Sequence, residues 1–165
     1  MATRTRARRR WRTLSWTAFP LLAAFAIGCG GDSELSRADF IEEADRVCER
    51  SSDEFARIQR TGPSTAQQAE EQTQELIDVS EQALDELREI EPPSDLSGGY
   101  ERYLAARERA IGYLEQGRDA AADADQRAYA AAKRRAARGA AERYQRARDV
   151  GLIACARPPV TLGND

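Results

Sequence analysis

The apolar side chains of this 165-residue chain recur every three or four positions from about residue 37 to residue 150. This spacing places them on one face of a helix, and it predicts four amphipathic helices joined by short connections. We expect these helices at about 37–60, 64–91, 95–117 and 119–150. No run of alternating apolar and polar residues indicates a strand. The predicted fold class is therefore all-α.

Residues that commonly begin and end helices support these boundaries. Ser36 can cap the first helix, with Asp39 three positions later, and Ser64 can cap the second. Gly117 is expected to end the third helix and Gly151 the fourth, because glycine accepts the left-handed conformation in which many helices stop. Four long helices with short connections favour an up-down-up-down bundle in a single domain. The alternative is one stable helix pair with two fraying helices.

The fourth predicted helix is rich in alanine and poor in large apolar residues. Its Ala132, Ala136 and Ala140, beside Gly139, form a narrow ridge. We expect the large side chains of neighbouring helices to pack closely on this ridge. A seam for dimerisation with a second copy of the helix is the alternative.

The N-terminus has the pattern of a bacterial export signal. Six arginines precede an apolar stretch of 14 residues, which is shorter than the roughly 20 apolar residues that a helix needs to cross a bilayer. Ala26-Ile27-Gly28 then leads into Cys29, which predicts a lipoprotein signal peptide over 1–28 and lipidation of Cys29. Two or three acyl chains would hold the protein stably on the outer face of the cytoplasmic membrane. An ordinary secretory signal cut near Gly28, giving a secreted protein, and an uncleaved anchor are the alternatives.

The rest of the chain is expected to form one domain between two short flexible segments. A tether over 29–35 precedes the helical domain at 36–156, and a flexible C-terminal tail follows at 157–165. A domain of about 120 residues has the usual size for a single core.

Removal of the signal would change the charge of the protein strongly. Residues 29–165 hold 19 basic and 28 acidic side chains, a net charge of −9. Such a surface argues against nucleic acid as a partner, because phosphate-backbone binding needs clustered cations. Both tryptophans, Trp11 and Trp16, also lie within the signal.

Three cysteines are present, and lipidation of one explains the odd number. Cys48 and Cys155 would then face an oxidising compartment, where a disulfide is the expected state. This bond would join the two ends of the domain. A redox-active pair is the competing interpretation, but the two cysteines lack the Cys-x-x-Cys spacing that lowers a thiol pKa.

The residue types exclude most chemistry that helical bundles carry out. Histidine is absent, and the only methionine is Met1, so the usual ligand sets for haem, di-iron and zinc sites are missing, as is the base of a catalytic triad. We therefore predict neither a metal nor a cofactor, and no enzymatic activity. Paired carboxylates such as Glu42-Glu43 are read as solvated helix faces.

The tyrosines are the remaining candidates for a binding site. Tyr103, Tyr129 and Tyr144 lie at helical spacings and can line a cavity between helices. The competing interpretation is core packing, with each hydroxyl reaching solvent.

Three parts of the chain together carry a resemblance. These are the stretch from Arg37 to Cys48, the Glu91-Pro92-Pro93 break and the ending Gly151-Leu152-Ile153-Ala154-Cys155. They resemble a group of small actinobacterial secreted proteins and lipoproteins of unknown function, over nearly the whole chain after the signal. The resemblance implies an extracytoplasmic helical domain with one disulfide joining its ends. It implies no catalytic residues.

The expected function is accordingly non-enzymatic. We expect a lipid-anchored helical module that binds an envelope protein or another envelope component. The alternatives are a small-ligand carrier with a cavity between its helices, and an acidic chaperone-like envelope protein.

Overall fold

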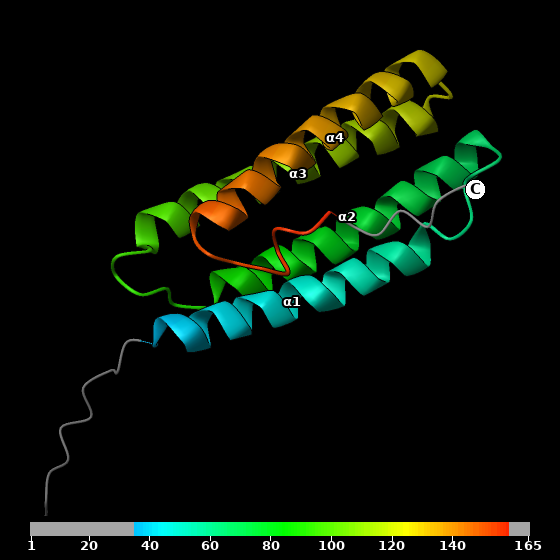
Figure 1. Cartoon of the computed structure of the whole chain (residues 1–165). Helices are drawn as coiled ribbons and strands as arrows, with labels where there is room; N and C mark the ends of the chain where they lie inside the picture. Colours follow the sequence, from blue (N-terminus) through cyan, green and yellow to red (C-terminus); the bar gives the residue numbers. More distant parts are fainter. Residues whose placement is uncertain (1–34, 159–165) are drawn as a thin grey trace, which may run out of the picture. The chain divides into compact units, whose positions relative to one another are not determined.

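A computed structural model describes residues 35–158, and these residues form four α-helices (Figure 1). The helices are α1 (Arg37–Ile58), α2 (Ala66–Arg88), α3 (Ser97–Ala122) and α4 (Gln126–Asp149). No strand occurs between residues 35 and 158, so the all-α prediction is confirmed. None of these four helices is both long and apolar enough to cross a bilayer. The predicted signal peptide, Cys29 and most of the predicted tether lie outside the described residues, as do residues 159–165.

Side-chain caps determine where α1 and α2 begin. Ser36 caps α1 as expected, since its Oγ accepts a hydrogen bond from the Asp39 backbone N–H at 3.1 Å. The expectation that Ser64 caps α2 is wrong, because the cap is Thr65, whose Oγ1 accepts from the Gln68 N–H at 3.1 Å. The Gln68 side chain reaches back to the Ser64 N–H and hydroxyl instead.

The expected boundary between the third and fourth helices is also wrong. Gly117 does not end α3, which continues to Ala122, and α4 begins at residue 126 rather than 119. Gly117 is buried, and a Cβ there would lie 3.7 Å from the Cβ of Ala132. Ala124, with φ of 54°, makes the turn, and the Asp125 side chain then caps α4.

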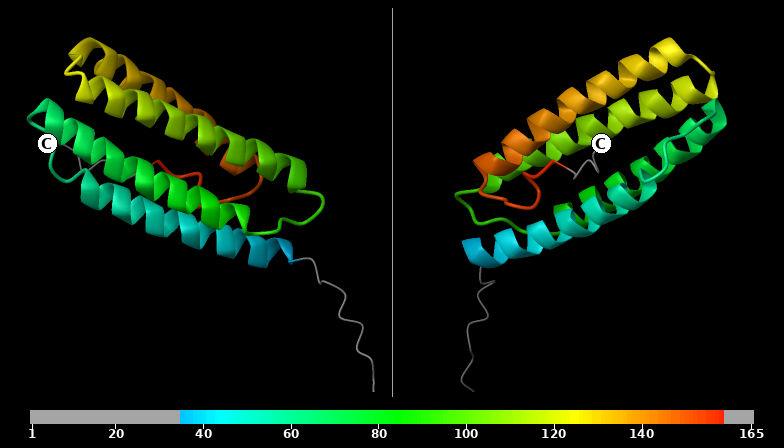
Figure 2. Two further views of the ribbon diagram at one scale, coloured as in Figure 1. Left: turned by 180° about the vertical axis from the view of Figure 1, so that it is seen from behind. Right: turned by 45° about the vertical axis from the view of Figure 1, so that its right-hand side comes forward.

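Consecutive helices pack side by side, whereas the backbones of α1 and α4 lie farther apart. Among the described elements, α1 contacts α2, α2 contacts α3 and α3 contacts α4, which gives the predicted antiparallel four-helix bundle. Gly151, with φ of 85°, ends α4 as expected. The chain then runs between α4 and α1 (Figures 1 and 2), and we call residues 150–158 the C-terminal segment.

The C-terminal segment is fixed to α1 by covalent and polar contacts. The predicted disulfide between Cys48 and Cys155 is confirmed, and it joins residues 107 positions apart. The Asp45 carboxylate accepts hydrogen bonds of 2.9–3.2 Å from the backbone N–H groups of Ile153, Ala154 and Cys155. One carboxylate and one sulfur bridge therefore hold this segment in the space between α1 and α4.

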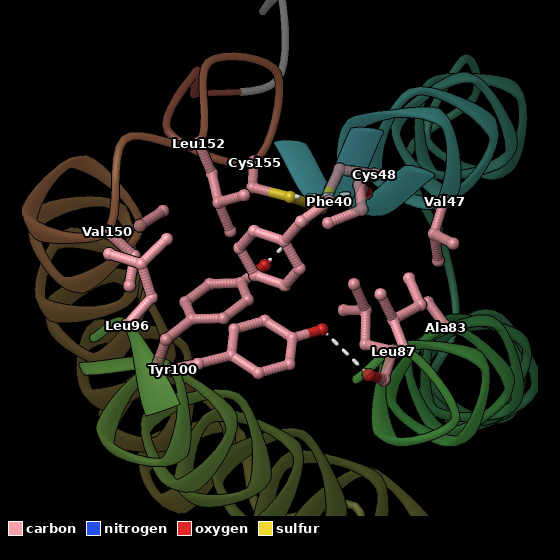
Figure 3. Packing of buried hydrophobic residues seen from close by; sticks show 14 residues of the cluster. Phe40, Val47, Cys48, Ala83, Leu87, Leu96, Tyr100, Val150, Leu152 and Cys155 are labelled. Carbon is pink, nitrogen blue, oxygen red and sulfur yellow. Dashed lines mark hydrogen bonds between the residues drawn. A yellow bond between two sulfur atoms is a disulfide. The ribbon is translucent and has the colours of Figure 1, made fainter. Parts of the chain in front are cut away.

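The main hydrophobic core lies around this disulfide (Figure 3). The Phe40 ring meets the Tyr100 ring edge-on at 4.9 Å, and the Tyr100 hydroxyl donates to the Leu87 carbonyl at 2.7 Å. Burial raises the pKa of Tyr100 above its ordinary range, and the nearby Tyr103 contributes to this rise. Both tyrosines are buried in the core, so Tyr103 packs there as the competing interpretation held, but its hydroxyl does not reach solvent. A smaller cluster of Ile77, Leu84 and Ile111 fills the middle of the bundle.

Candidate functional site

A groove runs along α3 beyond the C-terminal segment, with α4 on one side and α1 and then α2 on the other. It consists of three adjoining hollows with volumes of about 40, 180 and 210 Å³, starting from the disulfide. The first and second hollows share Phe55, Arg107, Arg143 and Tyr144, and the second and third share Gln59, Leu114 and Ala136. We call the three together the α1–α4 groove.

Small and apolar side chains form most of the middle of the groove. Ile111 and Leu114 come from α3, and Ala136, Ala137 and Ala140 come from α4. The expected close packing on the alanine ridge holds for Ala132, which is buried in the bundle. It is wrong for Ala136 and Ala140, which line the groove because α1 stays away from α4.

Arg107 of α3 lies at the disulfide end of the groove and is only 6% exposed. Its Nη1 donates to the Tyr103 hydroxyl at 3.0 Å and lies 3.8 Å from the Cys48 Sγ. Its Nε is buried without a hydrogen-bond partner. Within residues 35–158 no carboxylate forms an ion pair with Arg107.

Arg143 of α4 lines the same part of the groove. Its Nη2 donates to the Tyr144 hydroxyl at 3.2 Å, and its guanidinium carbon lies 4.9 Å from the centre of the Tyr144 ring. The residue as a whole is partly exposed, but its Nε is buried and has no partner. Burial lowers the pKa of Arg143, and the positive charge of Arg107 lowers it further. The side chain also has no ion pair to a described carboxylate.

The charge of the groove is opposite to that of the protein that carries it. No aspartate or glutamate lines any of its three hollows, whereas Arg107, Arg143, Arg157 and Lys133 do. Another hollow, of about 420 Å³ between α1 and α2, shares only Ser51 with the groove and shows the contrast. Asp53, Glu54 and Glu86 line it, and its Arg50 is paired with Glu86.

The three tyrosines that the sequence suggested have different places. Tyr129 and Tyr144 line the groove from α4. Tyr103 does not line it, because its ring is fully buried and its hydroxyl supports Arg107 from behind.

Sequence reasoning assigned no role to either arginine of the groove, although the signal was present. Arg107 lies on the apolar stripe of its helix, and Arg143 follows the alanine ridge three positions after Ala140. A charged residue on an apolar stripe indicates either a buried polar partner or a binding site.

The groove is not lined by the side chains that most often act as catalytic bases, nor by a free thiol. The chain has no histidine, the lining has no carboxylate, and both lining cysteines are in the disulfide. Between residues 35 and 158 there is also no group of three side chains that would hold a metal ion.

Comparisons with known proteins give no relative from which a role can be carried over. No protein-family model matches the chain, and neither a curated protein nor a solved structure is significantly similar to it. The groove and the N-terminal sequence are therefore the features that bear on function.

Proposed function

We propose that this protein is a non-enzymatic, lipid-anchored extracytoplasmic binding protein, and that it holds a small ligand in the α1–α4 groove. The observation that carries the proposal is the groove itself, which continues from the disulfide past Ala136 to Tyr129 with an apolar middle. Ligand sites in proteins are commonly concave, mostly apolar and supplied with a few polar groups. The proposal thus favours the carrier over the module that docks a protein.

The exposed surface supports this choice. Among residues 35–158, Ile153 is the one large apolar residue that is exposed, with 59% of its surface accessible to solvent. A lone exposed isoleucine is ordinary for a protein surface, whereas a docking face or a chaperone surface needs a contiguous apolar patch. The apolar side chains of the groove lie in a concave site, which suits a small ligand better than the surface of another protein.

The location is proposed from the sequence alone. The basic N-terminus, the short apolar stretch and Cys29 support export, lipidation and retention on the outer face of the membrane. Mass spectrometry of the N-terminal peptide from envelope membranes tests this. We expect a chain that begins at an acylated Cys29 and a Cys29→Ser variant that stays unprocessed. An unmodified Cys29, or a chain that begins elsewhere, would contradict the proposal.

Ligand binding is tested with a neutral apolar dye, N-phenyl-1-naphthylamine, whose fluorescence rises in apolar surroundings. The test uses residues 32–165, which contain the complete core and the disulfide. We expect saturable binding of one dye molecule per chain.

Two matched variants locate the dye. Ala136→Trp places an indole where the second and third hollows meet, and it should abolish binding. Ala141→Trp adds the same side chain at an exposed position of the same helix outside the groove, and binding should persist. Circular dichroism checks that both variants fold. The proposal fails if the wild-type fragment binds no dye, or if both variants bind it equally well.

A further inference from the structure

Arg107, which is buried, and Arg143, which is partly exposed with a buried Nε, lie at one end of the groove without acidic partners. Taking a charged group out of water costs several kcal/mol unless an opposite charge or hydrogen bonds compensate. Several other arginines are paired with carboxylates, as with Arg109 and Glu142 at 2.8 Å. Arginines of residues 35–158 that have no such pair, such as Arg102 and Arg138, are exposed to water. Arg107 and Arg143 lack such pairs in a chain that has an excess of acidic residues.

The tyrosine contacts use only part of what these arginines offer. A guanidinium has five N–H donors in a planar fork. Arg107 uses its Nη1 toward the Tyr103 hydroxyl and the Cys48 sulfur, and Arg143 uses its Nη2 toward the Tyr144 hydroxyl. Both Nε groups remain buried and unpartnered. The tyrosines therefore fix the positions of the two guanidiniums but leave donors of both without a protein partner.

The shape of the groove restricts what can meet those donors. The hollow next to the disulfide holds about 40 Å³, room for only a few water-sized groups, and both arginines line it together with Ser51. The larger hollows follow beyond the arginines, with the apolar side chains of α3 and α4 along them. A ligand with a small charged head group and a long apolar chain would fit these hollows in order.

We propose that the ligand is a single-chain amphiphile with a small oxyanion head, which Arg107 and Arg143 bind while its alkyl chain lies along α4 toward Tyr129. This inference rests on the proposed ligand groove and names the class of ligand. Arginine suits the role because its fork forms paired hydrogen bonds with carboxylate or phosphate oxygens. The negative surface repels anions in general, so the preference arises inside the groove.

The rival explanation gives the arginines a purely structural role, since each also lies near a tyrosine ring, at 5.8 Å for Arg107 and 4.9 Å for Arg143. Competition against the neutral dye separates the two. The competitors are dodecanoate, dodecyl phosphate, dodecanol and dodecyltrimethylammonium at pH 8, where the carboxylic acid is ionised. They share one alkyl chain and differ in the head.

We expect dodecanoate or dodecyl phosphate to displace the dye at about a tenfold lower concentration than dodecanol, and the cation to be the weakest competitor. The order of the two anions identifies carboxylate or phosphate as the preferred head. Arg143→Gln should remove about tenfold of the anion's affinity while changing that of dodecanol less than about twofold. Arg107→Gln should act in the same way if it folds.

Arg138→Gln is the matched control, because it removes one positive charge from an exposed position of the same helix. It should leave the anion preference unchanged. The inference fails if the wild-type fragment binds the dye but prefers no anion, or if Arg143→Gln and Arg138→Gln behave alike. Either result leaves the binding groove itself intact, whereas the absence of dye binding contradicts the groove.

Discussion

The disulfide should contribute more to the free energy of unfolding of this protein than any other single bond. The perturbation is Cys48→Ala together with Cys155→Ala, which removes the bond without leaving a free thiol. The bond closes a loop of 107 residues. Chain entropy predicts a loss of about 4.7 kcal/mol for a loop near 100 residues, and native disulfides of small secreted domains are worth about 2–5 kcal/mol.

The structure places the expected value in the upper part of that range. The C-terminal segment and α1 are adjacent through the disulfide and the Asp45 carboxylate, and the backbones of α1 and α4 lie farther apart than those of consecutive helices. The hydrogen bonds to Asp45 remain in the variant, and each contributes about 1 kcal/mol. Because these bonds still hold the C-terminal segment against α1, we expect the free energy of unfolding to fall by about 4 kcal/mol, slightly less than chain entropy alone predicts.

Urea unfolding followed by circular dichroism measures this loss. With a slope of about 2 kcal/mol per molar, the midpoint should fall by about 2 M. Reduction of the wild-type bond is the control, since it opens the same loop without altering side-chain volume, and it should give nearly the same shift. Amide exchange should accelerate most in residues 150–157. A loss below about 1 kcal/mol in the double variant would refute the reasoning that this bond connects the two ends of the fold.

Three further predictions concern single residues. Burial raises the pKa of Tyr100, so the folded protein keeps this proton above pH 10, where the unfolded chain loses it. The free energy of unfolding should therefore be constant to about pH 9 and fall above pH 10 by up to about 1.4 kcal/mol per pH unit. Chemical unfolding at several pH values measures this, and the fall should be shallower in Tyr100→Phe. Ala124→Gly should stabilise the protein by about 1 kcal/mol in urea, because Ala124 has a φ of 54°, and a lower midpoint would contradict this. Gly117→Ala should raise the thermal midpoint through about 0.5–1 kcal/mol of helix propensity, since its Cβ would have an ordinary 3.7 Å contact. Gly139→Ala should not raise it, because its Cβ would lie 3.0 Å from the ring of Tyr113. An equal gain in both variants would show that packing around the new methyl group plays no part.

The helices and the disulfide could be predicted because local signals and redox chemistry determine them. Apolar spacing identified four helices, and Ser36 and Gly151 marked two of their ends correctly. Gly117 misled, because a glycine can end a helix or let two helices approach closely, and the choice depends on which residue lies opposite. Here Ala132 lies opposite, and α3 continues.

A cavity between helices was one alternative from the sequence, but the position and the full lining of the groove could not be predicted, because they depend on a long-range arrangement. Four helices of similar length suggest a closed bundle, yet the C-terminal segment separates α1 from α4 and leaves the space beyond it open. That placement turned the outer alanines into a lining and brought Arg107 and Arg143 together. Tyr129 and Tyr144 line the groove and Tyr103 does not, and the tyrosine hypothesis named none of the cations that line the groove with them. Whether these tyrosines bind a ligand stays a prediction.

A crystal structure of residues 32–165 with dodecanoate tests the central claim most directly. The account predicts the carboxylate within hydrogen-bond distance of the Arg107 and Arg143 guanidiniums, with the alkyl chain passing Ala136 toward Tyr129. A groove that stays empty at saturating dodecanoate, or a chain bound elsewhere on the bundle, would contradict it.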